Sequence, residues 1–214
     1  MKYFYLLAIL FFTGCASLPE PTVISPVAVD DPQVEWQQRQ ARFSNFQAWH
    51  LNGRVSLRSE DDSVILKVNW QQKSQKIFKI LLSGPFSSML QLSGDGRNVE
   101  LNDGEKSVYA PDAEILLFEH TSIRMPVNGL RYWMLGLPQP GKLFEALELD
   151  VAGRLVSLQQ DDWQVNIKGY QQYGGEVLPA KLMITNHQLK VKFIIDNWTL
   201  PSSTSISSTA ATPG

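Results

Sequence analysis

The feature that most limits the fold of this chain is an alternation of apolar and polar residues that starts at Trp49. In the run 49–58, Val55 and Leu57 alternate with polar or charged neighbours, and the run 64–71 repeats the pattern. A period of two places successive side chains on opposite faces of a strand. Such strands form an antiparallel sheet with one apolar face and one hydrated face.

Further alternating runs follow along the chain, separated by turn sequences such as Gly94-Asp95-Gly96 and Asn102-Asp103-Gly104. They lie at 77–82, 89–92, 98–101, 106–109, 144–149, 154–159, 163–170, 181–185 and 188–198. Together with the first two runs they predict about eleven strands in one antiparallel sheet.

Three short helices interrupt or precede this pattern. Asp31 followed by Pro32 is a helix start, and we expect the helix to run to Phe46 with Val34, Phe43 and Phe46 near one face. In the middle of the chain, Asp112 can cap a helix at 113–119, and Asn128 can cap another at 129–135, closed by Gly136 and Pro138. Because the last two helices are very apolar, we expect them to lie against the sheet.

A sheet of this size has two possible arrangements. It can close into a packed barrel, or it can curl around an apolar space that the helices cover. Periodicity does not distinguish these, but six Trp, ten Phe and six Tyr are many aromatic residues for one such sheet. The aromatic content favours an open half-barrel around an apolar cavity, with the short helices as a lid.

The N-terminus has the features of an export signal. Lys2 precedes an unbroken apolar run at 3–12, which is too short to cross a bilayer core because that takes roughly 20 helical residues. Thr13 and Gly14 then lead to Cys15, the only cysteine of the chain. A single cysteine is usually a buried core thiol, but this position resembles the lipobox of bacterial lipoproteins. We therefore expect a signal peptide at 1–14 and lipidation of Cys15, with Ala16 directing the protein to the outer membrane.

The remaining organisation follows from composition. Pro19, Pro21 and Pro26 predict a flexible tether from Cys15 to Asp31. We expect one domain at 32–200, followed by a disordered Ser/Thr/Ala-rich tail at 201–214.

Charge and motifs argue against two classes of function. The formal charge of −2, with no run of basic residues, does not indicate nucleic-acid binding. His50, His120 and His187 lie in unrelated contexts, and the sequence contains neither a GxSxG nor an HExxH motif. We expect no catalytic residues, no metal site and no cofactor.

Several segments together resemble the LolB family, the outer-membrane receptors of lipoprotein localisation. They are Trp70-Gln71-Gln72, 82–88 (LSGPFSS), 125–138 (MPVNGLRYWMLGLP), Trp163-Gln164-Val165, Gly169-Tyr170 and Asp196-Asn197-Trp198. The stretch 125–138 is the most specific of these, and the similarity extends from about Gln33 to Leu200.

The resemblance implies a half-barrel that takes acylated lipoproteins from the periplasmic carrier LolA and releases them into the outer membrane without nucleotide or metal. The partners would be LolA, triacylated lipoprotein cargo and outer-membrane lipid. The protein would act as a monomer, held by its lipid to the periplasmic face of the outer membrane.

Strand parity and the two apolar helices provide candidates for the cavity lining. They are Val64, Leu66, Val68, Trp70, Phe78, Ile80, Leu82, Leu90, Leu92, Leu116, Trp133, Val191, Phe193 and Ile195. Each of them could equally be an ordinary core residue. Arg131 either meets an acidic partner or a polar group of the cargo, or only solvates its helix.

Pro85 and Phe86 are a separate candidate site. Phe86 sits in a turn sequence where a large apolar side chain has no strand face to occupy. In the family, this loop presents an exposed apolar side chain that delivers cargo into the membrane, although Phe stands here where Leu is expected.

A different reading of the same sheet remains open. A non-catalytic scaffold lipoprotein of an outer-membrane assembly complex would have the same anchor and strands but a filled core.

Overall fold

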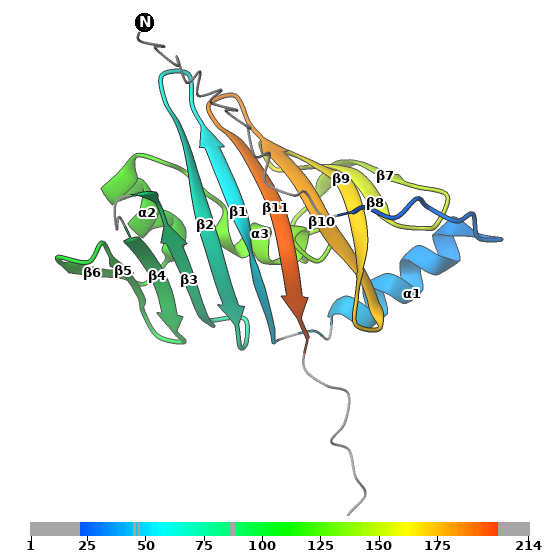
Figure 1. Ribbon diagram of the computed structural model, residues 1–214, viewed down its shortest axis with the longest axis horizontal. Helices are drawn as coiled ribbons and strands as arrows, with labels where there is room; N and C mark the ends of the chain where they lie inside the picture. The colour runs from blue at the N-terminus through cyan, green and yellow to red at the C-terminus, as the bar shows by residue number, and fades with distance from the viewer. Residues whose placement is uncertain (1–21, 45, 47, 86–88, 201–214) are drawn as a thin grey trace, which may run out of the picture.

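The computed structural model describes residues 22–44, 46, 48–85 and 89–200. In this part of the chain it contains three helices and eleven strands (Figure 1). The helices are α1 (Pro32–Ser44), α2 (Ala113–Thr121) and α3 (Val127–Trp133). The strands are β1 (Trp49–Arg58), β2 (Ser63–Gln72), β3 (Ile77–Ser83), β4 (Met89–Asp95), β5 (Val99–Asn102), β6 (Ser107–Ala110), β7 (Phe144–Leu149), β8 (Leu155–Gln160), β9 (Trp163–Tyr173), β10 (Glu176–Thr185) and β11 (Lys190–Thr199).

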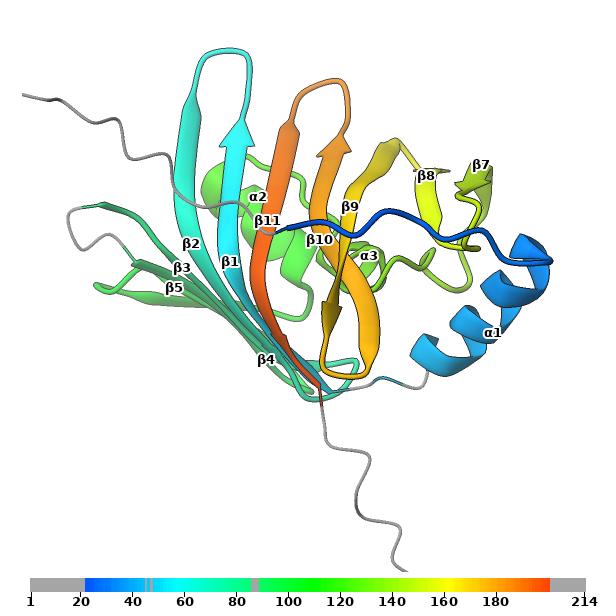
Figure 2. The same ribbon diagram turned by 45° about the vertical axis from the view of Figure 1, so that its right-hand side comes forward.

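All strands belong to one antiparallel sheet with the order β6-β5-β4-β3-β2-β1-β11-β10-β9-β8-β7. Within the described residues, β6 and β7 are its two edges and do not pair with each other, so the sheet is not closed. Figure 2 shows it curling around α2 and α3. The expected open half-barrel with helices over its inner face is therefore confirmed, and the closed barrel is not formed.

The two halves of the sheet meet where the first strand pairs with the last. β1 and β11 are in register from His50↔Thr199 to Arg58↔Lys190, with a bulge between Asn52 and Gly53. A side chain at Gly53 would place its Cβ 2.2 Å from the carbonyl oxygen of Ile194. Only glycine allows this close approach of the two backbones.

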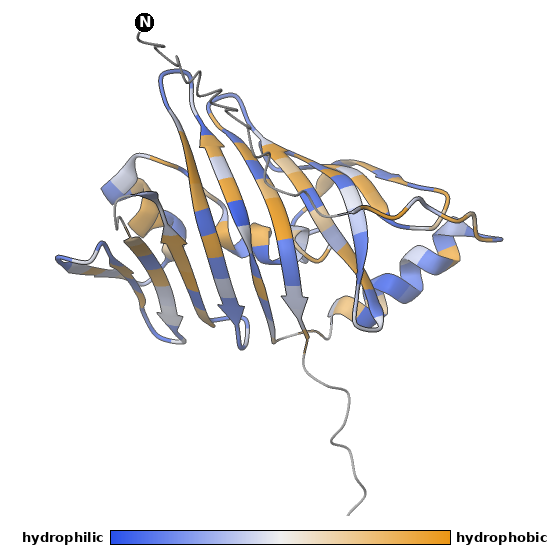
Figure 3. Ribbon diagram, viewed as in Figure 1, coloured by the Kyte–Doolittle hydropathy of each residue, from blue (hydrophilic) through white to orange (hydrophobic). Residues whose placement is uncertain are grey.

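The alternation of apolar and polar residues in the sequence gives the sheet one apolar face and one polar face. On β1, every second residue from Trp49 to Val55 is buried, and the residues between them are partly exposed. Figure 3 shows the resulting bands of hydrophobic and hydrophilic residues along the central strands. The apolar side chains of one face therefore form the core beneath the helices.

The helices α2 and α3, which cover the inner face of the sheet, are called the lid helices. Only α2 begins as its sequence suggests. For α2, the Asp112 carboxylate accepts hydrogen bonds from the backbone N–H groups of Glu114 and Ile115, so this cap is confirmed. For α3, the expected cap at Asn128 is wrong, because the helix already starts at Val127 after Pro126 and has no side-chain cap. The side chain of Pro126 cannot accept a hydrogen bond, and the backbone N–H of Asn128 in the first turn donates instead to Glu114 of α2.

Helix α1 packs against the β8–β10 end of the half-barrel. Asp31 caps it as expected, accepting from the backbone N–H of Gln33 at 2.9 Å. Its buried residues are Trp36, Arg39 and Phe43, whereas Val34, expected on this face, is 47% exposed. The sequence interpretation of this face was wrong for Val34, because it assumed that only apolar residues would be buried. The buried face of α1 includes the charged Arg39 instead.

Arg39 is held by backbone acceptors from two other parts of the fold. Its Nη1 donates to the Val177 carbonyl at 2.9 Å and its Nη2 to the Leu135 carbonyl at 3.3 Å. Its guanidinium also lies 4.4 Å from the ring centre of Phe43 and 5.3 Å from that of Tyr170. Burial lowers the pKa of Arg39, and these acceptors and rings replace the lost water.

The chain before α1 is not free over the whole length expected for a tether. The backbone N–H of Ile24 donates to the Tyr170 carbonyl at 2.8 Å, and that of Val29 donates to the Val151 carbonyl at 3.0 Å. Figures 1 and 2 both show this segment running across β9 toward α1. The expectation of a flexible tether up to Asp31 is therefore wrong for residues 22–30, because β9 extends beyond the end of β8 and offers an unpaired edge. The segments 1–21 and 201–214 lie outside the described residues.

We expect Arg39→Met to lower the free energy of unfolding by about 2–3 kcal/mol, because two buried carbonyls lose a charged donor. Chemical denaturation followed by tryptophan fluorescence measures this change.

Arg42→Met is the matched control on the same helix. Arg42 is 51% exposed and pairs with Glu176 at 3.4 Å, so its replacement should lower stability by less than about 1 kcal/mol. Equal effects of the two replacements would contradict a structural role for the Arg39 bonds.

Candidate functional site

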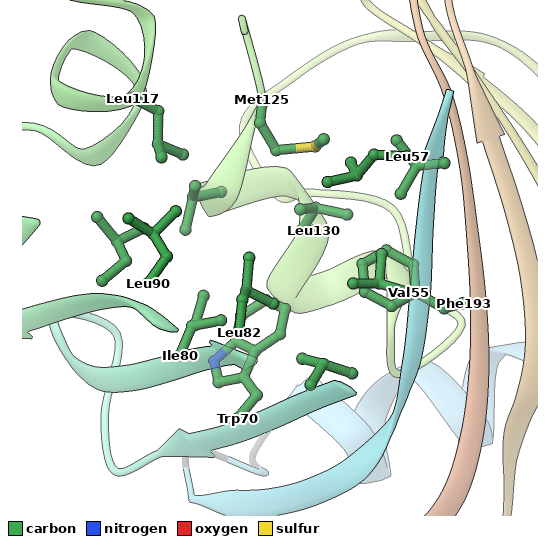
Figure 4. A pocket seen from close by; sticks show the side chains of 14 residues that line it. Val55, Leu57, Trp70, Ile80, Leu82, Leu90, Leu117, Met125, Leu130 and Phe193 are labelled. Atoms are coloured by element: carbon green, nitrogen blue, oxygen red, sulfur yellow. The ribbon is translucent and has the colours of Figure 1, made fainter. Parts of the chain in front are cut away.

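An apolar cavity lies between the inner face of the sheet and the two lid helices (Figure 4). Its volume is about 80 Å³. The lining residues are all apolar or aromatic: Val55, Leu57, Val68, Trp70, Ile80, Leu82, Leu90, Leu92, Leu117, Met125, Val127, Leu130, Val191 and Phe193. Figure 4 shows side chains from the strands and from the helix side converging on the same space. The cavity can therefore hold apolar groups and offers them no charged partner.

The deep end of the cavity rests on a cluster of tryptophans. Trp70 lines the cavity, and its ring centre lies 5.0 Å from that of Trp49, which in turn lies 5.2 Å from that of Trp198. The indole N–H of Trp70 donates to the Gln72 side chain at 2.9 Å. Because that N–H is bound within the protein, Trp70 presents only its apolar surface to the cavity.

The other end of the cavity is more open. Leu57, Leu82 and Leu90 are half-buried, whereas Val68 and Trp70 are almost fully buried. Leu82 and Leu90 face each other across β3 and β4, next to the connection that begins with Gly84 and Pro85. Exposure thus increases toward the end of the sheet at which β3 and β4 are connected.

Helix α3 is fixed at its C-terminal end. The indole N–H of Trp133 donates to the side chain of Gln160 on β8 at 2.9 Å, and that side chain also accepts from the backbone N–H of Gln139 at 2.8 Å. The Leu135 carbonyl accepts from Arg39. The C-terminal end of α3 is therefore bonded to the sheet and to α1, while its N-terminal half covers the cavity.

A carboxyl group links the two lid helices. Glu114 of α2 is half-buried and accepts a hydrogen bond from the backbone N–H of Asn128 in α3. Burial, together with the charge of Asp112, raises the pKa of Glu114 above the ordinary glutamate value, while the bond from Asn128 acts in the opposite direction. The contact between α2 and α3 therefore contains a charge that is only partly compensated.

The structure brings eight of the fourteen expected lining residues to this cavity: Val68, Trp70, Ile80, Leu82, Leu90, Leu92, Val191 and Phe193. That they bind acyl chains stays a prediction.

The other six do not line it. Val64 and Leu66 lie on the inward face of β2 nearer its exposed start, while Phe78 packs at the opposite end of β3. Leu116, Trp133 and Ile195 are buried in the surrounding core. The four strand residues among them face inward as parity requires, but parity does not say how far along a strand the cavity extends.

Sequence reasoning missed six lining residues: Val55, Leu57, Leu117, Met125, Val127 and Leu130. The alternation of β1 already indicated the inward position of Val55 and Leu57. Met125 lies between α2 and α3, and Val127 is the first residue of α3, so neither belongs to a periodic run in the sequence.

The loop candidate is only partly described. Pro85 is exposed, as a membrane-delivery loop would need. Phe86 and Cys15 lie outside the described residues.

Other chemistry has little support in this part of the chain. His50 lies on β1, His120 on α2 and His187 after β10, and among the described residues no three His, Cys, Asp or Glu side chains are placed to hold a metal ion. Nor does the described chain contain a helix long and apolar enough to cross a membrane.

Comparison with known proteins agrees with this geometry. The family model described as "Outer membrane lipoprotein LolB" matches residues 47–198. The outer-membrane lipoprotein LolB of Alkalilimnicola ehrlichii is 35% identical over 91% of this chain and 94% of its own length. That of Nitrosococcus oceani is 34% identical over 91% and 95%.

Among solved structures, a LolA superfamily protein from Nitrosomonas europaea shares the fold. It has a TM-score of 0.51 and 9% sequence identity, and the match covers 82% of this chain and 94% of that one. Together with the sheet and its apolar cavity, the family match identifies the chain as a member of the LolB family, with a role in lipoprotein localisation.

Proposed function

We propose that this protein accepts acylated lipoproteins from the periplasmic carrier LolA and inserts them into the outer membrane. It is anchored to the periplasmic face of that membrane by acyl chains on Cys15. The observation that carries the proposal is the cavity itself, which has a purely apolar lining and is most exposed beside the Gly84–Pro85 connection.

The energetics of an acyl chain explain why such a cavity is useful. Each buried methylene contributes about 0.8 kcal/mol, so a chain with a dozen or more methylenes would cost on the order of 10 kcal/mol to expose to water. A cavity lined by aliphatic groups and by the flexible Met125 removes most of this cost. Handover without nucleotide then requires affinity to rise from carrier to receptor and from receptor to membrane.

The cavity must widen before it can hold cargo. Its volume of about 80 Å³ is smaller than a cavity of about 150 Å³ that takes up benzene. The strands are held by continuous ladders, and the C-terminal end of α3 is held by Gln160 and Arg39. Opening therefore falls to α2 and to the N-terminal half of α3, including the link 122–126.

The scaffold alternative has less support. A scaffold would need only a filled core, whereas this core leaves an apolar space next to half-buried leucines. No feature of the described residues calls for that second function.

Transfer of cargo tests the proposal directly. A triacylated lipoprotein held by LolA is mixed with the immobilised protein, and the captured cargo is measured. Capture of the acylated cargo, but not of the same cargo stripped of its acyl chains, is the expected result. No capture by the folded protein would reject the receptor function.

Filling the cavity should block binding of apolar ligands. We expect Val68→Phe to weaken the binding of a fluorescent apolar probe by about tenfold, or about 1.4 kcal/mol, because the larger side chain enters the cavity. Fluorescence titration measures this. The control is Ile65→Phe on the outer face of the same strand, where the native residue is 66% exposed, and it should bind normally.

The loop should act in delivery and not in folding. We expect Phe86→Glu to keep the fold and the capture of cargo but to impair release into membranes, because a charge enters lipid unfavourably. Release is measured as cargo recovered in vesicles. Ile77→Glu places the same charge at an exposed position at the far end of β3 and should release cargo normally. Loss of folding in Phe86→Glu would place Phe86 in the core.

The lid contact should depend on pH. The pKa of Glu114 is raised in the folded state, so the folded protein binds this proton more tightly than the unfolded chain. Its stability therefore falls as the pH rises from the ordinary glutamate pKa through the raised pKa of Glu114. We therefore expect Glu114→Gln to raise the midpoint of thermal unfolding at neutral pH, and the gain to vanish near about pH 4, where glutamate is largely protonated. Glu119→Gln, at an exposed position of the same helix, should leave the midpoint of thermal unfolding unchanged both at neutral pH and at acidic pH.

A further inference from the structure

The outer face of the central strands carries a concentration of positive charge that the composition does not reveal. On β2, β1, β11 and β10, the outward positions hold six cations and one carboxylate. The cations are Lys67 on β2, Arg54 and Arg58 on β1, Lys190 and Lys192 on β11, and Lys181 on β10. We call these six residues the basic face. The whole chain has a formal charge of −2, so its acidic groups lie mainly elsewhere.

Strand register places these cations side by side. Arg54 is directly opposite Lys67, and Arg58 is directly opposite Lys190. Like charges in such positions destabilise a sheet. The carboxylate is Asp196, which pairs with Arg54 at 3.0 Å. Counted over these outward strand positions, the cations outnumber the carboxylate six to one, so the basic face has a net positive charge that attracts an external anion.

The shape of the basic face suits a surface better than a small ligand. From β2 to β10 it spans three strand spacings, or about 14 Å. Figure 1 shows these strands side by side, with α3 behind them. Ile65, which is 66% exposed, lies on the same outward face of β2 as Lys67. An array of cations with an interleaved aliphatic group is suited to the head-group region of an anionic leaflet.

The N-terminal segment leads from the expected lipid anchor to this face. Val23 contacts Gly169, where an added Cβ would lie 2.2 Å from its side chain, and Gly169 is in register with Lys181. The seven residues from Cys15 to Pro21 span at most about 25 Å. Acyl chains on Cys15 would thus hold the leaflet within reach of the basic face.

We propose that the basic face docks on the anionic phospholipids of the membrane that anchors the protein. The inference rests on the lipid anchor proposed at Cys15. Docking sets the orientation of the domain: the outer face of β2, β1, β11 and β10 meets the head groups. The lid helices lie on the opposite face, where a soluble partner can reach them.

The test uses the full-length lipidated protein in nanodiscs, labelled with a fluorophore at one introduced cysteine. Because Cys15 is the only natural cysteine, Ser56→Cys gives a single label within the basic face, and Glu119→Cys gives one on α2. The nanodiscs contain phosphatidylcholine alone or with added phosphatidylglycerol, and a quencher is attached to the lipid head groups.

We expect phosphatidylglycerol to increase quenching at position 56 by about fivefold and high salt to reverse it, while position 119 stays unquenched. The double replacement Lys67→Glu and Lys190→Glu should abolish the increase. The matched control Lys73→Glu and Lys106→Glu changes the net charge equally at exposed sites outside the basic face and should keep it.

Equal quenching at positions 56 and 119 in anionic nanodiscs would overturn the proposal. So would quenching that persists in the double replacement. If the double replacement instead weakens only the binding of an acidic carrier protein, the basic face docks a protein and not lipid. Co-purification with nanodiscs reports the Cys15 anchor separately, so failure of the anchor and failure of the docking face are distinguishable.

Discussion

The pairing of β1 with β11 is the interaction on which the rest of the structure depends. Every other pair in the sheet joins neighbouring strands in the sequence, whereas this pair joins the two ends of the domain. Its closure entropy is offset by nine registered residue pairs and by the close approach at Gly53. Val55, Val191 and Phe193 line the cavity from this pair, and Arg58 and Lys190 meet on its other face. Both surfaces to which we assign a function therefore form only when the ends of the domain meet.

The cavity has one rigid wall and one wall able to move. On the sheet side, continuous ladders fix the positions of the lining residues. On the helix side, polar bonds hold the C-terminal end of α3, while the contact between α2 and α3 includes the partly compensated carboxylate of Glu114. A receptor that must open and close gains from this difference, because the cavity can widen without breaking strand pairing.

Charged side chains lie on the outer face of the sheet, whereas the cavity on its inner face has none. The inner face presents no charged group to the cavity, and the outer face of β2, β1, β11 and β10 collects six cations. Alternation allows this because consecutive residues of one strand serve opposite faces. Leu57 and Arg58 are an example: one lines the cavity and its neighbour faces the solvent. A net charge near zero gave no indication of this arrangement.

The sequence alone determined the strands, the cap of α2 and the inward parity of residues such as Val68 and Val191, because these depend on local periodicity and local hydrogen bonding. Tertiary structure decided what depends on packing between distant segments. Whether the sheet closes depends on how its edges meet, and where the cavity ends depends on α2 and α3. The burial of Arg39 follows from carbonyls far along the chain, at Val177 and Leu135. Residues 22–30 lie against the domain because β9 has a free edge, which their own sequence does not reveal.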